Sequence, residues 1–301
     1  MELQQMRYVV AVAETNSFTR AAQRCLVVQS ALSHQIARLE RELGARLFER
    51  TSRRVRLTAA GEAFLPAARQ CLEAAERAGS EVAAAVGEIR GRLTVGVIPT
   101  VAAVDVPAAL QTFRGRYPHV RIGLRVGASG QLVEQIKDGA IEVAFLGLPV
   151  TDRPDGVATC ELGRDDLIAV VAPGHPLAVE SEVDLKRLSS EVFVDFPSGS
   201  AGRAQTDQAF AAAGVTREVA FEVTAADFMA RLIHQGLGVA LLPSKFVPNL
   251  TDVVTVPVRD APARIEHLVW NRFTVTPAAK AFLEILGVVS ETRPSHPART
   301  P

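Results

Sequence analysis

Near the N-terminus, the side chains best suited to chemistry are polar groups on one side of a helical pattern over about residues 29–42. The apolar stripe of this pattern is formed by Ala31, Leu32, Ile36 and Leu39. The other side carries Gln29, Ser30, Ser33, His34 and Arg38. Amide, hydroxyl, imidazole and guanidinium groups on one helix face can bond to base edges in the major groove of DNA. The pattern therefore predicts a recognition helix.

Two shorter helical patterns precede this segment, and a basic hairpin follows it. Helices are predicted over about 3–14 and 18–25, with Asn16 and Ser17 as candidate N-caps of the second. Residues 51–58 combine a polar turn with an alternating strand. A hairpin at this place would be a wing whose arginines reach phosphates or the minor groove; these are Arg50, Arg53 and Arg54.

Charge is distributed unevenly along the 301-residue chain. Residues 1–58 contain ten arginines, no lysine and five glutamates, a net charge of +5. The whole chain is neutral, so the remainder carries −5. A basic head on an acidic body is expected if only the head meets a polyanion, although a solvated charged surface would have the same composition.

A long helix is predicted from Thr58 to about Ile89. Apolar residues along it alternate in steps of four and three, which is a heptad seam. The seam consists of Phe64, Ala68, Cys71, Ala75, Ala78, Val82, Ala85 and Ile89. A lone helix of about 45 Å cannot bury such a stripe, so pairing with a copy of itself is expected. Packing on its own domain is the alternative, and Pro66 should kink the helix locally.

From Gly91 onward, apolar strands alternate with helices, which favours an α/β fold with a mostly parallel sheet. The pattern occurs twice, so two lobes are expected. Lobe 1 covers about 91–161 and 267–288, and lobe 2 about 162–266, with extended crossovers near 160–170 and 258–270. The predicted strands are 93–98, 120–126, 141–146, 192–196, 219–223 and 238–242.

Hydroxyl side chains occur where these predicted strands lead into helices. Each could be a simple N-cap, but together they predict a cavity between the lobes. Free N–H groups at helix starts there would favour a small anion. The residues expected to line it are Pro99, Thr100, Val101, Ser129, Phe145, Leu146, Phe196, Ser198, Gly199, Ser200, Arg203 and Thr224.

The first 61 residues resemble the LysR-type transcriptional regulators, and the chain stays colinear with that family to about residue 287. Two positions differ from the family pattern: Val28 stands where a capping Ser is frequent, and Ser30 where a Pro is common. The motifs that carry the resemblance are Ser17-Phe18-Thr19-x-Ala21-Ala22, Gln29-Ser30-Ala31-Leu32-Ser33-x-Gln35-Ile36, Leu43-Gly44-x-x-Leu47-Phe48-x-Arg50 and Leu57-Thr58-x-Ala60-Gly61.

The resemblance implies a winged helix-turn-helix over 1–58, a linker and dimerisation helix over 59–90, and an effector-binding regulatory domain over 91–290. That domain resembles type 2 periplasmic-binding proteins, and 291–301 would be a disordered tail. Implied partners are double-stranded promoter DNA, a small-molecule effector, RNA polymerase and further copies in a homodimer or homotetramer. The implied DNA contacts are Ser17, Phe18, Thr19, Gln29, Ser30, Ser33, His34, Gln35, Arg38, Arg50, Arg53 and Arg54.

Other functional classes have less support. The sequence has no HExxH, GxSxG, Walker A or GxGxxG motif, and none of its six histidines has a partner at metal-ligand spacing. We therefore expect no catalytic site, metal or cofactor. This expectation argues against the alternative that the protein is a hydrolase or transferase. The N-terminus does not resemble a secretory signal, which argues against a solute-binding protein and for a cytoplasmic one. A redox-responsive regulator remains the alternative, with Cys160 as its single thiol.

Overall fold

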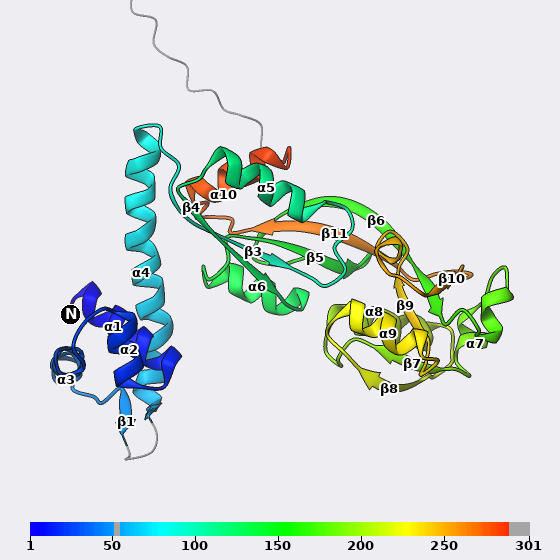
Figure 1. The fold of residues 1–301 in the computed structure, drawn as a ribbon, viewed down its shortest axis with the longest axis horizontal. Helices are drawn as coiled ribbons and strands as arrows, with labels where there is room; N and C mark the ends of the chain where they lie inside the picture. The colour runs from blue at the N-terminus through cyan, green and yellow to red at the C-terminus, as the bar shows by residue number, and fades with distance from the viewer. Residues whose placement is uncertain (51–54, 289–301) are drawn as a thin grey trace, which may run out of the picture. The chain divides into compact units, whose positions relative to one another are not determined.

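The computed structural model describes residues 1–50 and 55–288. Arg53, Arg54 and the tail expected over 291–301 lie outside the described residues. The chain divides into two compact units, Met1–Gly91 and Arg92–Pro301, which are described separately (Figure 1).

The N-terminal unit begins with three helices around a small apolar core. Its helices are α1 (Leu3–Thr15), α2 (Phe18–Arg24), α3 (Gln29–Leu43) and α4 (Ala59–Ala85). Ser17 starts α2 because its Oγ accepts the N–H of Arg20, and Gly44 ends α3 with φ 67°, which glycine adopts without strain. The core residues include Val9, Val12, Ala21, Leu32, Ile36, Leu39 and Leu47. Ala31, expected in the buried stripe of α3, is exposed instead.

A two-stranded hairpin follows α3. Its strands are β1 (Phe48–Arg50) and β2 (Val55–Leu57), which pair antiparallel. The carboxylate of Glu40 accepts the N–H groups of Leu47 and Phe48 and so fixes the turn between α3 and β1. Phe48 packs edge-on against Phe18, with ring centroids 5.7 Å apart, which ties the hairpin to α2.

The long helix α4 ends at Ala85, before Ile89, so the last position of the expected seam lies outside it. It runs through Pro66. Phe64 packs on the core of its own unit and Ala68 is buried. The first turns of α4 therefore pack on their own unit, as the alternative to pairing with a second copy had proposed. Beyond them, the seam positions exposed in the single chain are Cys71, Ala78, Val82 and Ala85.

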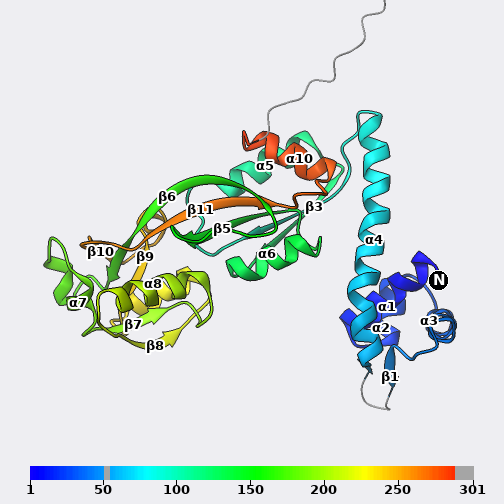
Figure 2. The same cartoon turned by 180° about the vertical axis from the view of Figure 1, so that it is seen from behind.

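The C-terminal unit is built on a seven-stranded sheet. In the order β10-β6-β11-β5-β3-β4, neighbouring strands are hydrogen-bonded, and β9 also pairs with β6. The strands are β3 (Gly91–Val97), β4 (Val120–Val126), β5 (Val143–Pro149), β6 (Ala158–Val171), β9 (Ala240–Pro243), β10 (Val254–Val256) and β11 (Ala263–Trp270). In lobe 1, α5 (Val106–Arg116) and α10 (Pro277–Ile285) cover one face of the sheet and α6 (Ser129–Lys137) the other (Figures 1 and 2).

The expectation of a mostly parallel sheet is wrong for the strands that join the lobes. β3 pairs parallel with β5, but β11 pairs antiparallel with both β5 and β6. The chain crosses between the lobes once in each direction, on β6 and on β11. Two neighbouring strands that run in opposite directions can pair only in the antiparallel manner.

Lobe 2 has its own parallel pair, with a buried ion pair beside its aromatic core. The pair is β7 (Val192–Asp195) and β8 (Glu218–Glu222), with α7 (Leu185–Leu188), α8 (Ala201–Ala212), α9 (Ala226–His234), η1 (Pro176–Val179) and η2 (Val247–Asn249) around it. The guanidinium of Arg217 lies over the rings of Phe193 and Phe210 and donates to Asp195 at 2.5 Å. Burial raises the pKa of Asp195, and Arg217 opposes that shift.

None of the described helices has both the length and the apolar character needed to cross a membrane.

The stability of this unit is expected to fall in mild acid because of His267. This β11 residue is fully buried, Thr159 Oγ1 lies 3.3 Å from its Nδ1, and burial lowers its pKa. The unfolded chain binds a proton there near pH 6.5, whereas the folded protein binds it only at lower pH. The free energy of unfolding should therefore be fully retained above about pH 6.5 and decrease below it, by at most about 1.4 kcal/mol per pH unit.

Chemical denaturation between pH 5 and 8 measures this dependence. His267→Gln should remove part of the decrease, while His119→Gln, at an exposed histidine, should leave it unchanged. Identical pH profiles for wild type and His267→Gln would contradict the assignment.

Candidate functional site

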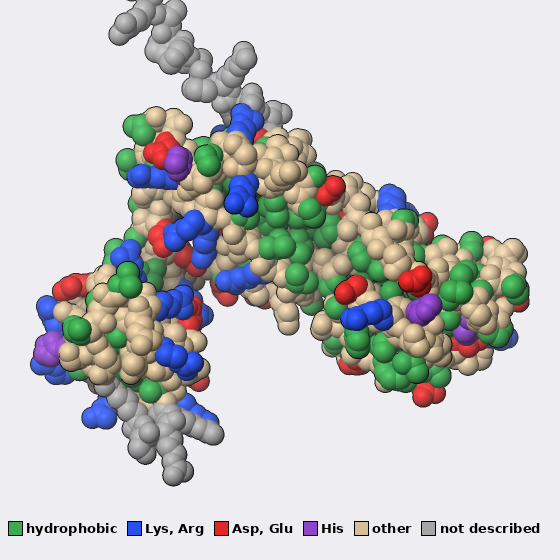
Figure 3. Space-filling view, in the orientation of Figure 1, with side chains coloured by type: hydrophobic (Ala, Val, Ile, Leu, Met, Phe, Trp, Pro, Cys, Tyr) green, Lys and Arg blue, Asp and Glu red, His purple; other side chains and the backbone are tan. Residues whose placement is uncertain are grey.

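The exposed face of α3 presents a polar surface of the kind expected for base recognition. Gln29, Ser30, His34 and Arg38 are exposed, and Ser33 is half-buried. Gln29 Nε2 donates to Ser33 Oγ at 2.8 Å, so both side chains can present donors and acceptors at the start of the helix. Figure 3 shows basic side chains on the flanks of the N-terminal unit.

Some predicted DNA contacts have different surroundings in the structure. Gln35 is half-buried and accepts a hydrogen bond from Gln5 Nε2 at 3.3 Å, so its side chain is directed at α1. Phe18 is 7% exposed and belongs to the core. Ser17 is used as the cap of α2, while Thr19 is exposed. Arg50 ends β1, and Arg53 and Arg54 lie outside the described residues.

A cavity of about 880 Å³ lies in the C-terminal unit and is lined by both lobes. Lobe 1 contributes the end of β3 and the start of α6, and lobe 2 contributes the starts of α8 and α9 and the segment 241–250. The predicted residues that line it are Pro99, Thr100, Ser129, Phe196, Ser198, Gly199, Ser200 and Thr224.

Four predicted lining residues lie elsewhere. Phe145 and Leu146 are buried in the lobe 1 core, because β5 continues to Pro149 and only its Gly147 reaches the cavity. Val101 packs against the same core. Arg203 is turned toward other partners: its Nε is 3.0 Å from Asp207 and its Nη1 2.9 Å from Glu222.

The buried hydroxyls of the cavity wall already have protein partners. Thr100 Oγ1 accepts from Arg264, and Ser129 Oγ donates to the carbonyl of Gly147. Neither caps a helix: α5 is capped by Asp105, and Ser129 stands one residue inside α6. Ser200 is the N-cap of α8, the alternative role considered for each of these hydroxyls, and it also lines the cavity. Ser198 and Thr224 are exposed at the cavity.

Two lining residues with unused donors were not anticipated from the sequence. Gln205 on α8 is 6% exposed, and its Nε2 has no hydrogen-bond partner among the described residues. Arg264 on β11 is 4% exposed, and its Nε likewise has none. A buried N–H group without a partner is unfavourable by about 1–3 kcal/mol. A small turn of either side chain toward an acceptor in the cavity would therefore be favourable.

Arg264 is the centre of a buried network that reaches both lobes. Its Nη groups donate to Thr100 Oγ1 and to the Thr100 carbonyl, both at 2.8 Å, and to Glu266 Oε1 at 2.6 Å. Asp165 Oδ2 lies 3.8 Å away. Burial lowers the pKa of the guanidinium, and Glu266 and Asp165 oppose that shift. The two carboxylates therefore hold the charged form of Arg264 in place.

The carboxylates extend this network to two loops. Glu266 accepts the N–H groups of Ala102 and Ala103, which follow Thr100 in lobe 1. Asp165 accepts from the hydroxyl of Ser244 at 2.7 Å, in the segment that follows β9. One signal was available in the sequence: Arg264 and Glu266 are two residues apart in the same strand and so share a face.

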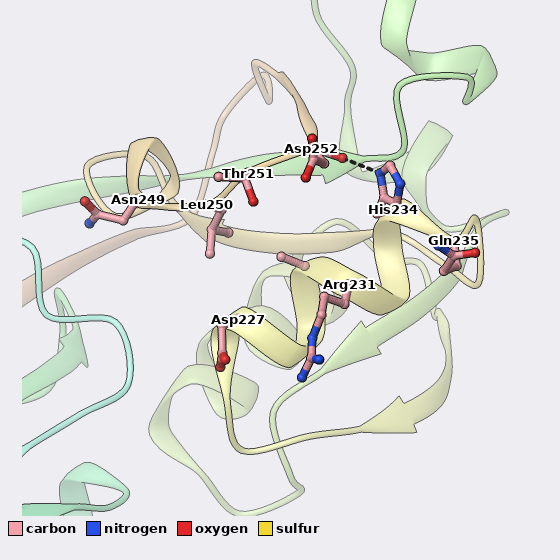
Figure 4. A pocket seen from close by; sticks show the side chains of 9 residues that line it. Asp227, Arg231, His234, Gln235, Asn249, Leu250, Thr251 and Asp252 are labelled. Atoms are coloured by element: carbon pink, nitrogen blue, oxygen red, sulfur yellow. Dashed lines mark hydrogen bonds between the residues drawn. The ribbon is translucent and has the colours of Figure 1, made fainter.

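A second, smaller cavity of about 470 Å³ lies beside α9 (Figure 4). His234 Nδ1 is 2.8 Å from the carbonyl of Asp252 there. In Figure 4 the side chains of Asp227 and Arg231 point away from the loop 249–252, so the polar groups do not converge on one place. The larger cavity is the better candidate for a ligand.

Both parts of the chain match family models. Residues 3–62 match the bacterial regulatory helix-turn-helix proteins of the lysR family, and residues 87–289 match the LysR substrate binding domain. Among curated relatives, the transcriptional dual regulator GltC of Bacillus subtilis is 34% identical over 86% of each chain. The Hca operon transcriptional activator HcaR of Escherichia coli is 34% identical, over 95% of this chain and 97% of its own.

Solved structures agree with this comparison. The LysR family transcriptional regulator CbnR superposes with a TM-score of 0.72 at 27% identity, over 95% of this chain and 98% of that one. A second structure of full-length CbnR, in complex with its target DNA, gives the same TM-score and identity and covers 99% of that chain.

Proposed function

The chain belongs to the LysR family of transcriptional regulators, and from this premise we propose that α3 reads promoter DNA while the cavity of the C-terminal unit holds a small organic anion. The proposal of a bound anion rests mainly on two buried donors without a hydrogen-bond partner among the described residues. They are Gln205 Nε2 and Arg264 Nε, on two residues that line this cavity. The effector would adjust the angle between the lobes and, through it, the arrangement of the DNA-binding units of an oligomer.

The DNA half of the proposal assigns different tasks to α3 and to the wing. Gln29, Ser30, Ser33 and His34 would meet base edges, and Thr19, Arg50, Arg53 and Arg54 would meet the backbone or minor groove. A dimer would cover two half-sites about one helical turn, or a multiple of it, apart. The proposed target is double-stranded promoter DNA, and the proposed location is therefore the cytoplasm. RNA polymerase is the proposed protein partner at the promoter.

Replacing Gln29 by alanine should relax sequence preference, because a good base contact discriminates by about 1–3 kcal/mol. Replacing Arg53 by alanine should instead weaken binding to all sequences equally and flatten the salt dependence. Gel shifts with duplexes selected from a random pool, at several salt concentrations, measure both effects. A changed preference in Arg53→Ala together with an unchanged one in Gln29→Ala would reverse the assignment.

The anionic character of the effector is supported by backbone as well as side chains. The cavity is lined by the N-terminal residues of α6, α8 and α9, whose free N–H groups and dipoles favour a negative group. Apolar side chains, including Ile98, Phe196 and Leu241, would cover the rest of the molecule. A small organic carboxylate combines these two properties.

Two substitutions of Gln205 test the sign of the charge. Gln205→Met keeps the size of the side chain and removes its N–H donor. Because the Nε2 group has no hydrogen bond to lose, the stability of the protein should change little. The affinity for a carboxylate should fall about fivefold to thirtyfold. Gln205→Glu should weaken an anion further by repulsion. Calorimetric titration with a panel of small carboxylates and their amides measures this, with the exposed Gln208→Glu as control. Equal carboxylate affinity in Gln205→Met, Gln205→Glu and wild type would remove Gln205 from the site.

The redox alternative has no comparable support. Cys160 is half-buried on β6 and is not among the cavity residues, and its Sγ donates to the carbonyl of Glu161 at 3.6 Å. We therefore propose the small-molecule effector alone. The exposed seam of α4 supports a homodimer, and assembly to a homotetramer is part of the same proposal.

A further inference from the structure

Two aliphatic side chains are exposed to solvent at the turn between α2 and α3. Leu26 is 92% exposed and Val28 is 68% exposed. Val27, between them, packs on the core of the unit, so the turn is anchored while its two neighbours face outward. Hydrophobic contact inside the single chain therefore does not account for either residue.

Both residues also break local rules of helix construction. Leu26 has φ 55°, a left-handed conformation that a leucine adopts only with strain and that asparagine or glycine would adopt more easily. Val28 is the N-cap of α3 and offers no side-chain hydrogen bond. The same unit caps α2 with Ser17 and α4 with Thr58, so α3 lacks a stabilising hydroxyl that its neighbours have.

The position of this pair suggests why local stability is given up here. Val28 directly precedes Gln29, whose side chain lies with Ser33 at the N-terminal end of α3. That end of a recognition helix is the part that meets base edges. The apolar feature available in the major groove is the 5-methyl group of thymine, and strain at adjacent exposed residues is typical of functional sites.

We propose that Val28, with its apolar surface extended by Leu26, contacts the 5-methyl group of a thymine in each half-site. The inference rests on the proposed reading of DNA by α3. It adds a hydrophobic contact to the polar contacts of Gln29 and Ser33, and it makes thymine preferred over cytosine and over uracil at that position.

Substituting deoxyuridine for thymine tests this, because it removes the methyl group and nothing else. The full-length protein is first used to select a binding duplex from a random pool, and each thymine of that duplex is then replaced in turn. Wild type should lose about fourfold in affinity at one thymine per half-site, the value for one buried methyl-sized group. The loss should vanish in Val28→Ser.

Val28→Ser is a suitable variant because serine can cap α3, so its thermal unfolding midpoint should equal or exceed that of wild type. Leu26→Asn, which relieves the left-handed conformation, should reduce the deoxyuridine effect only in part. Equal deoxyuridine effects in wild type and Val28→Ser, or none at any thymine, would overturn the inference while leaving DNA recognition by α3 intact. Failure of the wild type to select any sequence would overturn the proposed function and this inference with it.

Discussion

Replacing Arg264 by methionine is expected to destabilise the C-terminal unit by about 3–5 kcal/mol and to abolish the response to effector. The side chain is 5% exposed, with Glu266 at 2.6 Å and Asp165 at 3.8 Å. Methionine fills a similar volume but leaves two buried carboxylates without their counter-charge. The loss of the bonds to Thr100 would also release the loop at the cavity wall.

Urea denaturation of the full chain, monitored for the C-terminal unit, measures the effect. Arg259→Met is the matched control, because its ion pair with Glu182 is exposed and should contribute little to stability. Adding Glu266→Gln to Arg264→Met should restore part of the stability, since it removes one of the unpaired charges. If the single variant Arg264→Met were as stable as wild type, the charge of Arg264 would not be what stabilises the network.

Replacing Val82 by glutamate is expected to weaken subunit association at least a hundredfold. Val82 is 68% exposed in the single chain and lies on the seam with Ala75, Ala78 and Ala85. If two copies of α4 pair along this seam, each dimer would bury two carboxylates with no partner, at several kcal/mol per charge. Small alanine side chains favour close approach, so the paired helices have little room to let water reach the new charges.

Sedimentation equilibrium at micromolar concentration checks the oligomeric state. Glu81→Lys is the control, because it changes the charge one position away, at an exposed residue outside the seam. DNA affinity should fall together with association, since a dimer holds two DNA-binding units. An unchanged oligomer in Val82→Glu would mean that subunits associate through another surface.

Local features of the N-terminal unit followed from the sequence. The spacing of Leu32, Ile36 and Leu39 predicted the buried side of α3, and all three are fully buried. Ser17 caps α2 as expected. Caps and helical stripes depend on residues three or four positions apart, so the sequence contains all the information that they need.

Part of the cavity lining was also predictable from the sequence, because it depends on the order of the elements along the chain. The order strand, loop, helix decides which loops reach the end of a sheet, and so Thr100, Ser129, Ser198 and Ser200 were expected at the cavity and line it. Phe145 was wrongly included because the end of β5 depends on its pairing with β11, whose residues are more than a hundred positions away in the sequence. Arg203 was wrongly included because its side chain pairs with Asp207, four residues along α8, and with Glu222 on β8, and the second partner is far away in the sequence.

The charged centre of the cavity was decided by tertiary structure alone. Arg264 meets Asp165 because β6 and β11 pair antiparallel in one particular register. It meets Thr100, which follows β3, because β11 and β3 both pair with β5, which stands between them in the sheet. Nothing within a few residues of Arg264 specifies either partner. The sequence by itself determined which helices and loops form and which family they belong to. The register of long-range strand pairs determined which buried charges meet there, because such contacts join residues far apart in the chain and depend on the whole fold.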